Sequence, residues 1–229
     1  MQGIILVDKP ATWTSFDVVN YVRRIVATHE GKKPKNCKVG HTGTLDPFAT
    51  GLLVLLIGKE YTRKAAALSK VDKTYEVTMT LGVTSNTGDP EGEITPVSDT
   101  VPTQDATLEA LKGFRGEIEQ IPPAFSAIKV NGQRAYKLAR EGKEVVIEPR
   151  RVTINSLDLS DYNYPSVKLI ANVSSGTYIR TLVEDIGKVL GTGAYTSELR
   201  RTTVGDFSIE DAVEVKAIDQ QNIIDKKYS

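Results

Sequence analysis

The sequence predicts an α+β protein with a central mixed, largely antiparallel sheet and flanking helices. Short apolar or alternating segments, typical of strands, follow one another in runs, and amphipathic segments separate only some of them. The 229 residues are 40% hydrophobic and 25% charged, which is enough to bury a sizeable core. No change in composition marks a domain boundary, so we expect a single domain over residues 1–229.

In the first third of the chain, the hydrophobic pattern changes from strand to helix and back. Residues 3–8 are typical of a buried strand, and Thr14 to Asp17 form a capping-box pattern at the start of an amphipathic helix. Residues 40–51 are rich in Gly, Thr and Pro and predict a loop. The apolar run 52–57 predicts a strand that is covered on both faces, and residues 74–83 alternate as a half-buried strand does.

The remaining two thirds predict further strands and helices. We expect a helix over 103–114 with Leu108 and Leu111 inward, and a short basic helix over 134–141. Residues 152–159 and 167–173 alternate and should pair as antiparallel strands. A helix over 178–190 precedes a strand over 195–204, and two short helices should follow from residue 209. The core positions of the 178–190 helix are Ile179, Leu182, Val183, Ile186 and Val189.

Composition excludes several classes of protein. No run of about 18 apolar residues is present, and the N-terminus lacks the basic start of a signal peptide, so we expect a cytoplasmic protein without a membrane span. One cysteine and two histidines are too few for a structural zinc site or an internal disulfide. Gly191-Thr192-Gly193 lacks the third glycine of a dinucleotide-binding loop. We therefore expect neither a cofactor nor a metal.

Charge is balanced overall but unevenly distributed. Residues 1–75 hold 12 Lys/Arg and 6 Asp/Glu, residues 76–125 hold 2 and 9, and residues 126–151 hold 7 and 3. Zero net charge argues mildly against a nucleic-acid partner, because phosphate binding requires basic surface. A basic face would survive if the acidic segment folded away from the ligand. Evenly solvated charge is the alternative for any single cluster.

The segment from Gly40 to Gly51 is the best candidate for a catalytic loop. Its sequence is Gly-His-Thr-Gly-Thr-Leu-Asp-Pro-Phe-Ala-Thr-Gly, with the acid at Asp46. The glycines allow unusual backbone conformations and Pro47 restricts the chain after the carboxylate, so one acid can be held in a defined place. A loop aspartate that only caps its own turn is the alternative, and from these residues alone it is the better one.

This loop resembles the catalytic motif of the TruB family, the bacterial tRNA pseudouridine-55 synthases. Further similarities follow in order over residues 3–207. They are Val7-Asp8-Lys9-Pro10, Lys73-Thr74-Tyr75, Ile121-Pro122-Pro123 through Ser126 to Lys129, Gly176-Thr177-Tyr178-Ile179-Arg180, and Leu199-Arg200-Arg201. The resemblance implies a pseudouridine synthase-like catalytic domain that isomerises uridine to pseudouridine in the T-loop of tRNA, with no cofactor and no metal.

The resemblance also implies roles for individual residues. Asp46 would be the nucleophile or base, Arg180 its ionic partner, and Tyr75 the group that stacks on the flipped uracil and transfers a proton. The residues implied in substrate binding are His41, Tyr178, Leu199, Lys9, Lys129 and Arg134. Simpler readings stay open for several of them: core packing for Leu199 and Tyr178, a strand-end lysine for Lys9, and a solvated helix face for the basic residues.

The expected partner is the T-arm stem-loop of tRNA, bound by a monomer. An RNA-gripping insertion should lie around residues 122–150, and a short helical tail around 208–229. Many family members also carry a C-terminal RNA-binding module of the PUA type, and we expect none in these 229 residues because too few follow the last motif. Two other functions stay open: a tRNA-folding module with secondary or no catalysis, and a metal-dependent phosphodiesterase. The residues do not choose between attack at the ribose C1′, addition to uracil C6 and elimination.

Overall fold

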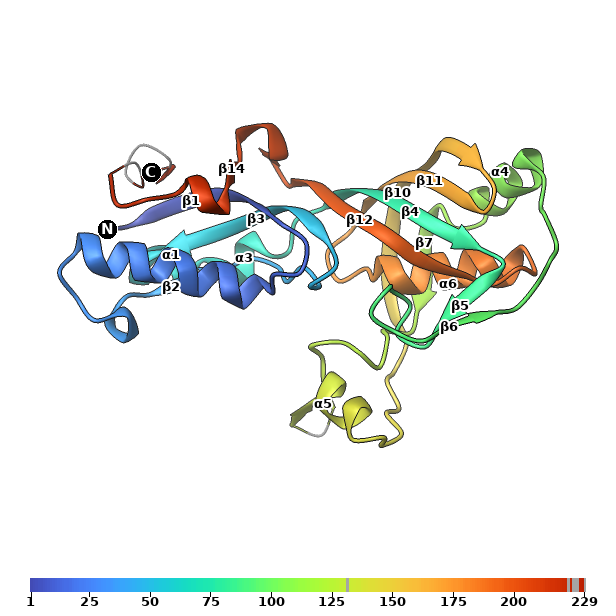
Figure 1. Cartoon of the computed structure of the whole chain (residues 1–229), viewed down its shortest axis with the longest axis horizontal. Helices are drawn as coiled ribbons and strands as arrows, with labels where there is room; N and C mark the ends of the chain where they lie inside the picture. The colour runs from blue at the N-terminus through green and yellow to red at the C-terminus, as the bar shows by residue number, and fades with distance from the viewer. Residues whose placement is uncertain (131, 222, 224–226, 229) are drawn as a thin grey trace. The chain divides into compact units, whose positions relative to one another are not determined.

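A computed structural model describes residues 1–130, 132–221, 223 and 227–228. The chain divides into two compact units (Figure 1). Unit 1 comprises Met1–Tyr75 and Leu199–Ser229, and unit 2 comprises Glu76–Glu198. The chain passes between them within two strands, β4 (Lys73–Leu81) and β12 (Ala194–Val204). The predicted α+β class with a mixed sheet is confirmed, whereas the sequence did not reveal the division into units.

Unit 1 is built around two strands that are buried on both faces. β1 (Gly3–Lys9) pairs antiparallel with β3 (Thr50–Ile57), from Gly3 opposite Ile57 to Lys9 opposite Gly51. Alternate residues of β3 enter two hydrophobic clusters. Leu53, Leu55 and Ile57 lie in one, and Leu52, Val54 and Leu56 in the other. The continuous apolar run therefore forms the expected strand covered on both faces.

Helices close these two clusters. α1 (Ser15–His29) buries Val18, Val19, Val22 and Val26 in the first cluster, and its N-terminus has the predicted capping box between Thr14 and Asp17. The second cluster is joined by Tyr61 from α2 (Gly58–Arg63) and by residues of α3 (Ala65–Leu68). A short 3-10 turn, η1 (Pro34–Asn36), separates α1 from β2 (Val39–His41), which pairs antiparallel with β3.

The C-terminal segment completes unit 1 along both sides of this strand pair. β12 runs parallel to β3, with Arg200 opposite Thr50 and Arg201 opposite Gly51. β13 (Phe207–Ser208) pairs with β12, while β14 (Val213–Glu214) and β15 (Lys227–Tyr228) pair with β1. The two short helices expected in the tail are three-residue 3-10 turns, η2 (Ile209–Asp211) and η3 (Val215–Ala217).

Unit 2 contains antiparallel strands and one long amphipathic helix. β10 (Arg150–Asn163) pairs with β11 (Ser166–Val173), as predicted, and with β7 (Gly116–Gln120). The strand order is β12-β4-β11-β10-β7. α6 (Ile179–Val189) lies along these strands in Figure 1 and buries Ile179, Leu182, Val183 and Ile186.

Two predicted core residues of unit 2 are instead exposed. Val189 is 64% exposed because it lies in the last turn of α6, at the edge of the apolar stripe. Leu108 of α4 (Gln104–Lys112) is 39% exposed, because the buried stripe of this short helix follows Thr107 and Leu111 at i, i+4 spacing.

The predicted insertion forms a separate segment of unit 2. It contains a small hairpin, β8 (Lys129–Val130) and β9 (Gln133–Arg134), followed by α5 (Ala135–Arg140). Figure 1 shows α5 standing away from the unit 2 sheet. A second small hairpin, β5 (Val83–Ser85) with β6 (Ile94–Pro96), flanks an acidic loop. No helix in the described ranges is long and apolar enough to cross a membrane.

Candidate active site

The loop between β2 and β3 carries Asp46 and is fixed on both sides of that residue. The buried Ser15 hydroxyl accepts a hydrogen bond from the Leu45 N–H at 2.8 Å and donates one to the Leu45 carbonyl at 3.0 Å. The Thr12 N–H donates to the Pro47 carbonyl at 2.8 Å, and the Ala49 N–H donates to the Asp46 carbonyl at 3.2 Å. The half-buried Asp46 side chain is therefore carried on a main chain held at each adjacent residue.

Lys9 is the third anchor of this loop. Its side chain is 0% exposed, and its Nζ donates to the carbonyls of Trp13 at 2.6 Å, Pro10 at 2.9 Å and Pro47 at 3.3 Å. A buried ammonium is tolerated only with such partners, since burying an unsatisfied charge is very costly. This geometry favours the role of Lys9 in setting the carboxylate loop over contact with an RNA backbone.

His41 ends β2 at the start of the loop and is half-buried. Burial and the positive charge of Arg201 lower the pKa of His41, against a smaller opposing effect of the Gly43 backbone. The imidazole is therefore neutral at pH 7, which suits a residue that stacks on bases. Its Nδ1 is buried and has no hydrogen-bond partner within the described chain. The stacking role itself stays a prediction.

Tyr75 and Leu199 are both buried, with 7% and 8% of their surface exposed. Tyr75 is the last residue of the first segment of unit 1, on β4, and Leu199 is the first residue of the second segment, on β12. Two residues before Tyr75, the Lys73 side chain donates to the carbonyls of Ser69 and Val71 at 3.1 and 2.6 Å. The roles of Tyr75 in stacking and of Leu199 in lining a pocket stay predictions.

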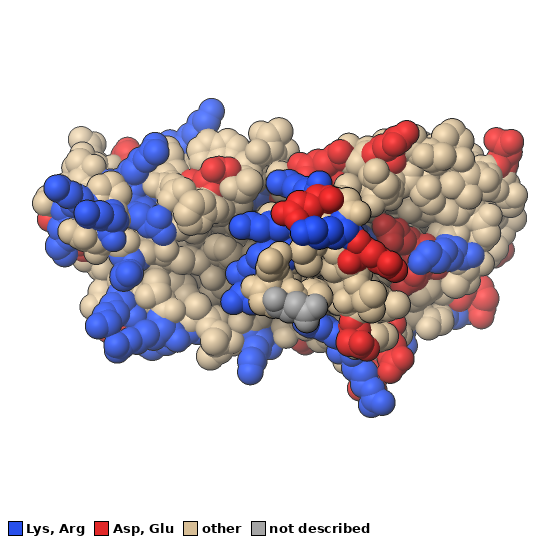
Figure 2. Space-filling view, turned by 90° about the horizontal axis from the view of Figure 1, so that it is seen from below, with Lys and Arg blue, Asp and Glu red and all other residues tan. Residues whose placement is uncertain are grey.

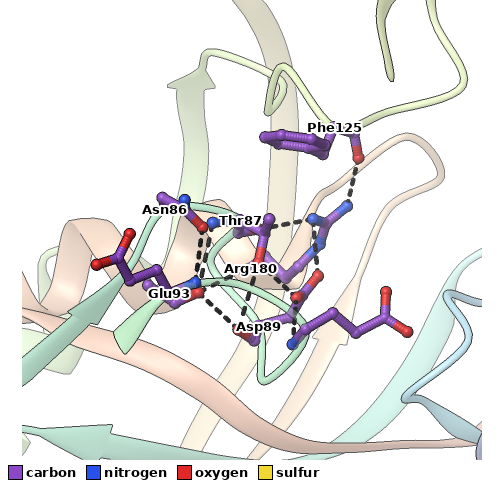
Figure 3. A network of polar contacts seen from close by, with 8 residues as sticks. Asn86, Thr87, Asp89, Glu93, Phe125 and Arg180 are labelled. Atoms are coloured by element: carbon purple, nitrogen blue, oxygen red, sulfur yellow. Dashed lines mark hydrogen bonds and ion pairs between the residues drawn. The ribbon is translucent and has the colours of Figure 1, made fainter. Parts of the chain in front are cut away.

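Arg180 lies in the first turn of α6 in unit 2 and is the centre of a buried polar network (Figure 3). Its Nη1 donates to the Thr87 carbonyl at 2.7 Å and to Asp89 Oδ2 at 3.0 Å, and its Nη2 donates to the Phe125 carbonyl at 2.8 Å. Only 4% of the Arg180 side chain is exposed, so Arg180 is not a solvated residue on the helix surface. Its pairing with Asp46 stays a prediction, because the two residues belong to different units.

Asp89 is a buried partner of Arg180 that the sequence did not reveal. Its carboxylate is 5% exposed, and besides Arg180 it accepts hydrogen bonds from the Thr87 hydroxyl at 2.6 Å and the Glu91 N–H at 3.0 Å. It lies in an acidic, turn-rich segment, where solvated charge is the ordinary expectation. The only available signal was an acid within a run of turn-forming residues, which is too common to select Asp89.

Beside this network, Glu184 of α6 lies against the Asp89 loop, because a Cβ added at Gly88 would lie 2.4 Å from Glu184 Oε1. Burial raises the pKa of the Glu184 carboxyl above its ordinary value, and the nearby Lys188 opposes this effect. Within the described chain, no group of three His, Cys, Asp or Glu side chains is placed to hold a metal ion.

The other predicted binding residues also lie in unit 2. Tyr178 is the N-cap of α6, and its main chain exchanges two hydrogen bonds with the buried Gln120 side chain, at 2.7 and 3.0 Å. Lys129 and Arg134 are exposed on the β8–β9 hairpin, and Arg134 donates to the Ala127 carbonyl. On α5, the Arg140 guanidinium lies 5.6 Å from the centre of the Tyr136 ring. The insertion thus presents basic side chains together with an aromatic one.

Lys and Arg side chains gather over the end of unit 1 that holds α1 and β2, whereas Asp and Glu gather over unit 2 (Figures 1 and 2). The structure therefore keeps the charge separation that the sequence shows between residues 1–75 and 76–125. Unit 1 brings Asp46, Lys9, His41, Tyr75 and Leu199 into one compact body, and unit 2 holds the remaining predicted site residues.

Comparison with known proteins identifies a matching family and similar proteins. Residues 30–179 match the N-terminal domain of the TruB family of pseudouridylate synthases, and residues 180–228 match the tRNA pseudouridylate synthase B C-terminal domain. The chain is 43% identical over 220 residues to tRNA pseudouridine synthase B of Pseudomonas aeruginosa, covering 96% of this chain and 69% of that protein. It is 41% identical to the Chlamydia trachomatis protein of the same name, covering 96% and 88%.

Solved structures show the same fold. A Cbf5-Nop10-Gar1 complex contains a chain with 31% identity and a TM-score of 0.70, matched over 93% of this chain and 52% of that one. A chain of an H/ACA RNP bound to a substrate RNA containing 2'-deoxyuridine matches with 28% identity and a TM-score of 0.67, over 93% and 51%. The protein thus spans about half the length of these solved chains. These matches, together with the ordered motifs around Asp46 and Arg180, show that the protein belongs to the TruB family of pseudouridylate synthases.

Proposed function

We propose that the protein isomerises uridine to pseudouridine in the T-loop of tRNA, at position 55, with Asp46 as its essential chemical group. The observation that carries the proposal is an aspartate whose flanking residues, Leu45 and Pro47, are both fixed through their main chains. Curated relatives named tRNA pseudouridine synthase B support the substrate class. RNA is therefore the expected partner, and tRNA modification is expected to take place in the cytoplasm.

The reaction needs a positioned carboxylate rather than a cofactor. The C–N bond between uracil N1 and ribose C1′ breaks, the base rotates, and a C–C bond forms between C5 and C1′. The hydrogen on C5 leaves as a proton and N1 gains a proton, so the product is an isomer of the substrate. An ionised Asp46 serves this exchange as a nucleophile or as a base.

The other residues have supporting roles in this proposal. The target uridine is flipped out of its stack, and planar side chains hold the displaced bases. We assign this stacking to the neutral His41, and we assign stacking on the flipped uracil, with proton transfer, to Tyr75. Arg180 is the ionic partner of Asp46, because a nearby guanidinium keeps a carboxyl ionised and fixes its orientation.

The insertion is proposed to grip the RNA. Lys129 and Arg134 on the β8–β9 hairpin and the basic α5 face solvent, and arginine together with an aromatic ring suits contact with RNA. Each lysine or arginine bound to phosphate should contribute to the salt dependence of affinity. Charge reversal at both Lys129 and Arg134 should therefore weaken RNA binding and flatten its salt dependence, while the rate from the bound complex stays close to wild type.

The test measures tritium release from a T-arm stem-loop RNA that carries tritium at C5 of its uridines. Wild type should release tritium from the target uridine, and Asp46→Asn should release none while still binding the RNA. Asp206→Asn is the matched control, because Asp206 is an exposed aspartate of the same unit, in the turn between β12 and β13. It should behave as wild type.

Three outcomes would contradict the proposal. RNA binding without release by wild type would indicate a tRNA-folding module. Release that stops in excess EDTA would indicate metal chemistry. Release that persists with the T-loop uridine replaced by cytidine would refute the site specificity.

We also expect the protein to act as a monomer. Light scattering at the assay concentration should therefore give a mass of 25.0 kDa.

A further inference from the structure

Arg201 is the most deeply buried arginine among the described residues of unit 1, and it has no role in the mechanism above. Only 1% of it is exposed, although the neighbouring Arg200 side chain is 37% exposed and pairs with Asp8 at 2.7 Å. A buried guanidinium without partners would strongly destabilise the fold. Its hydrogen bonds therefore indicate what the residue holds in place.

All side-chain partners of Arg201 in the described chain are main-chain carbonyls at the two ends of the Asp46 loop. Nε donates to Leu52 at 2.8 Å, Nη2 to Gly43 at 3.1 Å, and Nη1 to Thr44 at a longer 3.5 Å. No carboxylate forms an ion pair with this guanidinium within the described residues. The guanidinium N–H groups of an arginine usually bind carboxylates, but those of Arg201 bind main-chain carbonyls of the loop.

The main chain of Arg201 holds the far end of the same loop. Arg201 lies opposite Gly51 in the parallel pairing of β12 with β3. Gly51 has φ +100°, and a Cβ there would lie 2.3 Å from the Arg201 carbonyl oxygen and 2.7 Å from its nitrogen. The loop therefore closes onto the Arg201 backbone at Gly51, while the Arg201 side chain holds its beginning at Gly43 and Thr44.

The electrostatic surroundings agree with an unpaired buried charge. Arg201 contributes to lowering the pKa of both His41 and Lys73, second in each case to burial. The positive charge of Arg201 thus acts both on His41, at the start of the loop, and on Lys73, whose side chain lies near Gly43.

We propose that Arg201 is a positioning residue for Asp46: its guanidinium holds the loop main chain so that the carboxylate stands in its reactive place before RNA binds. The proposal rests on the proposed function, because it names a further determinant of the same reaction. Arg201 acts through the backbone of Gly43, Thr44 and Leu52, and it need not touch the RNA. A displacement of about 1 Å at a reacting group can cost about 100-fold in rate.

The test compares Arg201→Met, Arg201→Lys and Arg23→Met with wild type. Arg23 is the matched control, since it also lies in unit 1 and donates to a main-chain carbonyl, that of Val39 at 3.1 Å, outside the loop. Tritium release is measured in a single turnover with enzyme in excess, and RNA affinity is measured separately. Hydrogen exchange of the peptide covering residues 42–52 reports on loop order without depending on activity.

Arg201→Met should lose about 100-fold in single-turnover rate with RNA affinity changed less than about threefold, and its loop should exchange faster. Arg201→Lys, which keeps the charge but not the planar fork, should recover part of the rate. Arg23→Met should lose stability but keep both the rate and the loop protection. If Arg201→Met does not fold, Arg201→Lys decides, with at least a tenfold loss of rate expected.

The inference is overturned if a folded Arg201 variant keeps the wild-type rate and loop protection, or if rate and RNA affinity fall together. Failure of the proposed function is a different result, namely no tritium release by wild type. In that case, hydrogen exchange still decides whether Arg201 orders the loop. Unchanged protection in Arg201→Lys and Arg201→Met would then overturn the inference.

Discussion

Replacing Asp89 with asparagine tests the Arg180 network in unit 2. Asparagine has nearly the same shape, so its oxygen can still accept from the Thr87 hydroxyl and the Glu91 N–H. Its amide nitrogen then faces Arg180 Nη1, where the carboxylate oxygen lay 3.0 Å away. One charge-assisted hydrogen bond is replaced by two donors that face each other.

The magnitude follows from the burial of this pair. Both side chains are at most 5% exposed, so solvent does not screen the loss. A hydrogen bond to a charged group contributes about 1.5–3 kcal/mol to stability, and we expect Asp89→Asn to lower the free energy of unfolding by about that amount. For a chain of this length, the melting temperature should fall by about 3–12 °C.

Chemical denaturation and calorimetry would measure the loss of stability, and single-turnover tritium release would measure the effect on the reaction rate. The rate should fall because Arg180 loses a fixed orientation, and a double-mutant cycle with Arg180→Lys should show coupling between the two residues. Asp185→Asn is the control, since it breaks an exposed pair with Lys188 on the same helix, a contact worth at most about 1 kcal/mol. Wild-type stability and rate for Asp89→Asn would refute the network as a determinant of Arg180.

Three further predictions concern unit 1. The pKa of Lys73 is lowered to about 8, chiefly by burial, so the unfolded chain binds more protons at Lys73 above that pH. Urea unfolding should therefore show stability rising between about pH 8 and 10.5 through this residue, and Lys73→Met should remove that rise. Burial lowers the pKa of His41, so the wild-type protein should lose stability below about pH 6.5, and His41→Phe should remove that loss. The aromatic ring of His41→Phe should also keep most of the single-turnover rate, whereas His41→Ala should lose it. Thermal unfolding should show that Gly51→Ala lowers the free energy of unfolding by about 2–5 kcal/mol, through backbone strain and steric overlap. Gly116→Ala should cost much less, because Gly116 has a similar φ of +91° but no atom lies within 4 Å of the added Cβ.

Local patterns in the sequence were sufficient for most elements of the fold. The capping box at Thr14 and the run from Leu52 to Ile57 depend on neighbouring residues alone, and both form as expected. Leu108 and Val189 were placed wrongly because they lie at the edges of apolar stripes, where packing against other elements decides burial. The candidate acid, Asp46, was found through its loop and the family resemblance rather than through periodicity.

Contacts between distant residues could not be predicted in this way. Arg180 and Asp89 are 91 positions apart, and no local pattern distinguishes Asp89 from the other acids of its segment. The anchors of the Asp46 loop have the same property, since Ser15 reaches Leu45 across 30 positions and Arg201 reaches Gly43 across 158. The sequence identifies chemistry that a single loop carries, but the residues that hold such a loop come from elsewhere.

Arg200 and Arg201 show how one position along a strand decides such a role. Successive residues of a strand point to opposite faces, so the same side chain type has two different environments. Arg200 is partly exposed and pairs with Asp8, and Arg201 is buried and holds the loop. A shift of β12 by one residue would place either Arg200 or Thr202 at the position of Arg201, and Arg201 would no longer donate to the loop carbonyls. Because the close contact of Gly51 with the Arg201 backbone fixes this register, the glycine at the end of the loop also determines which arginine supports Asp46.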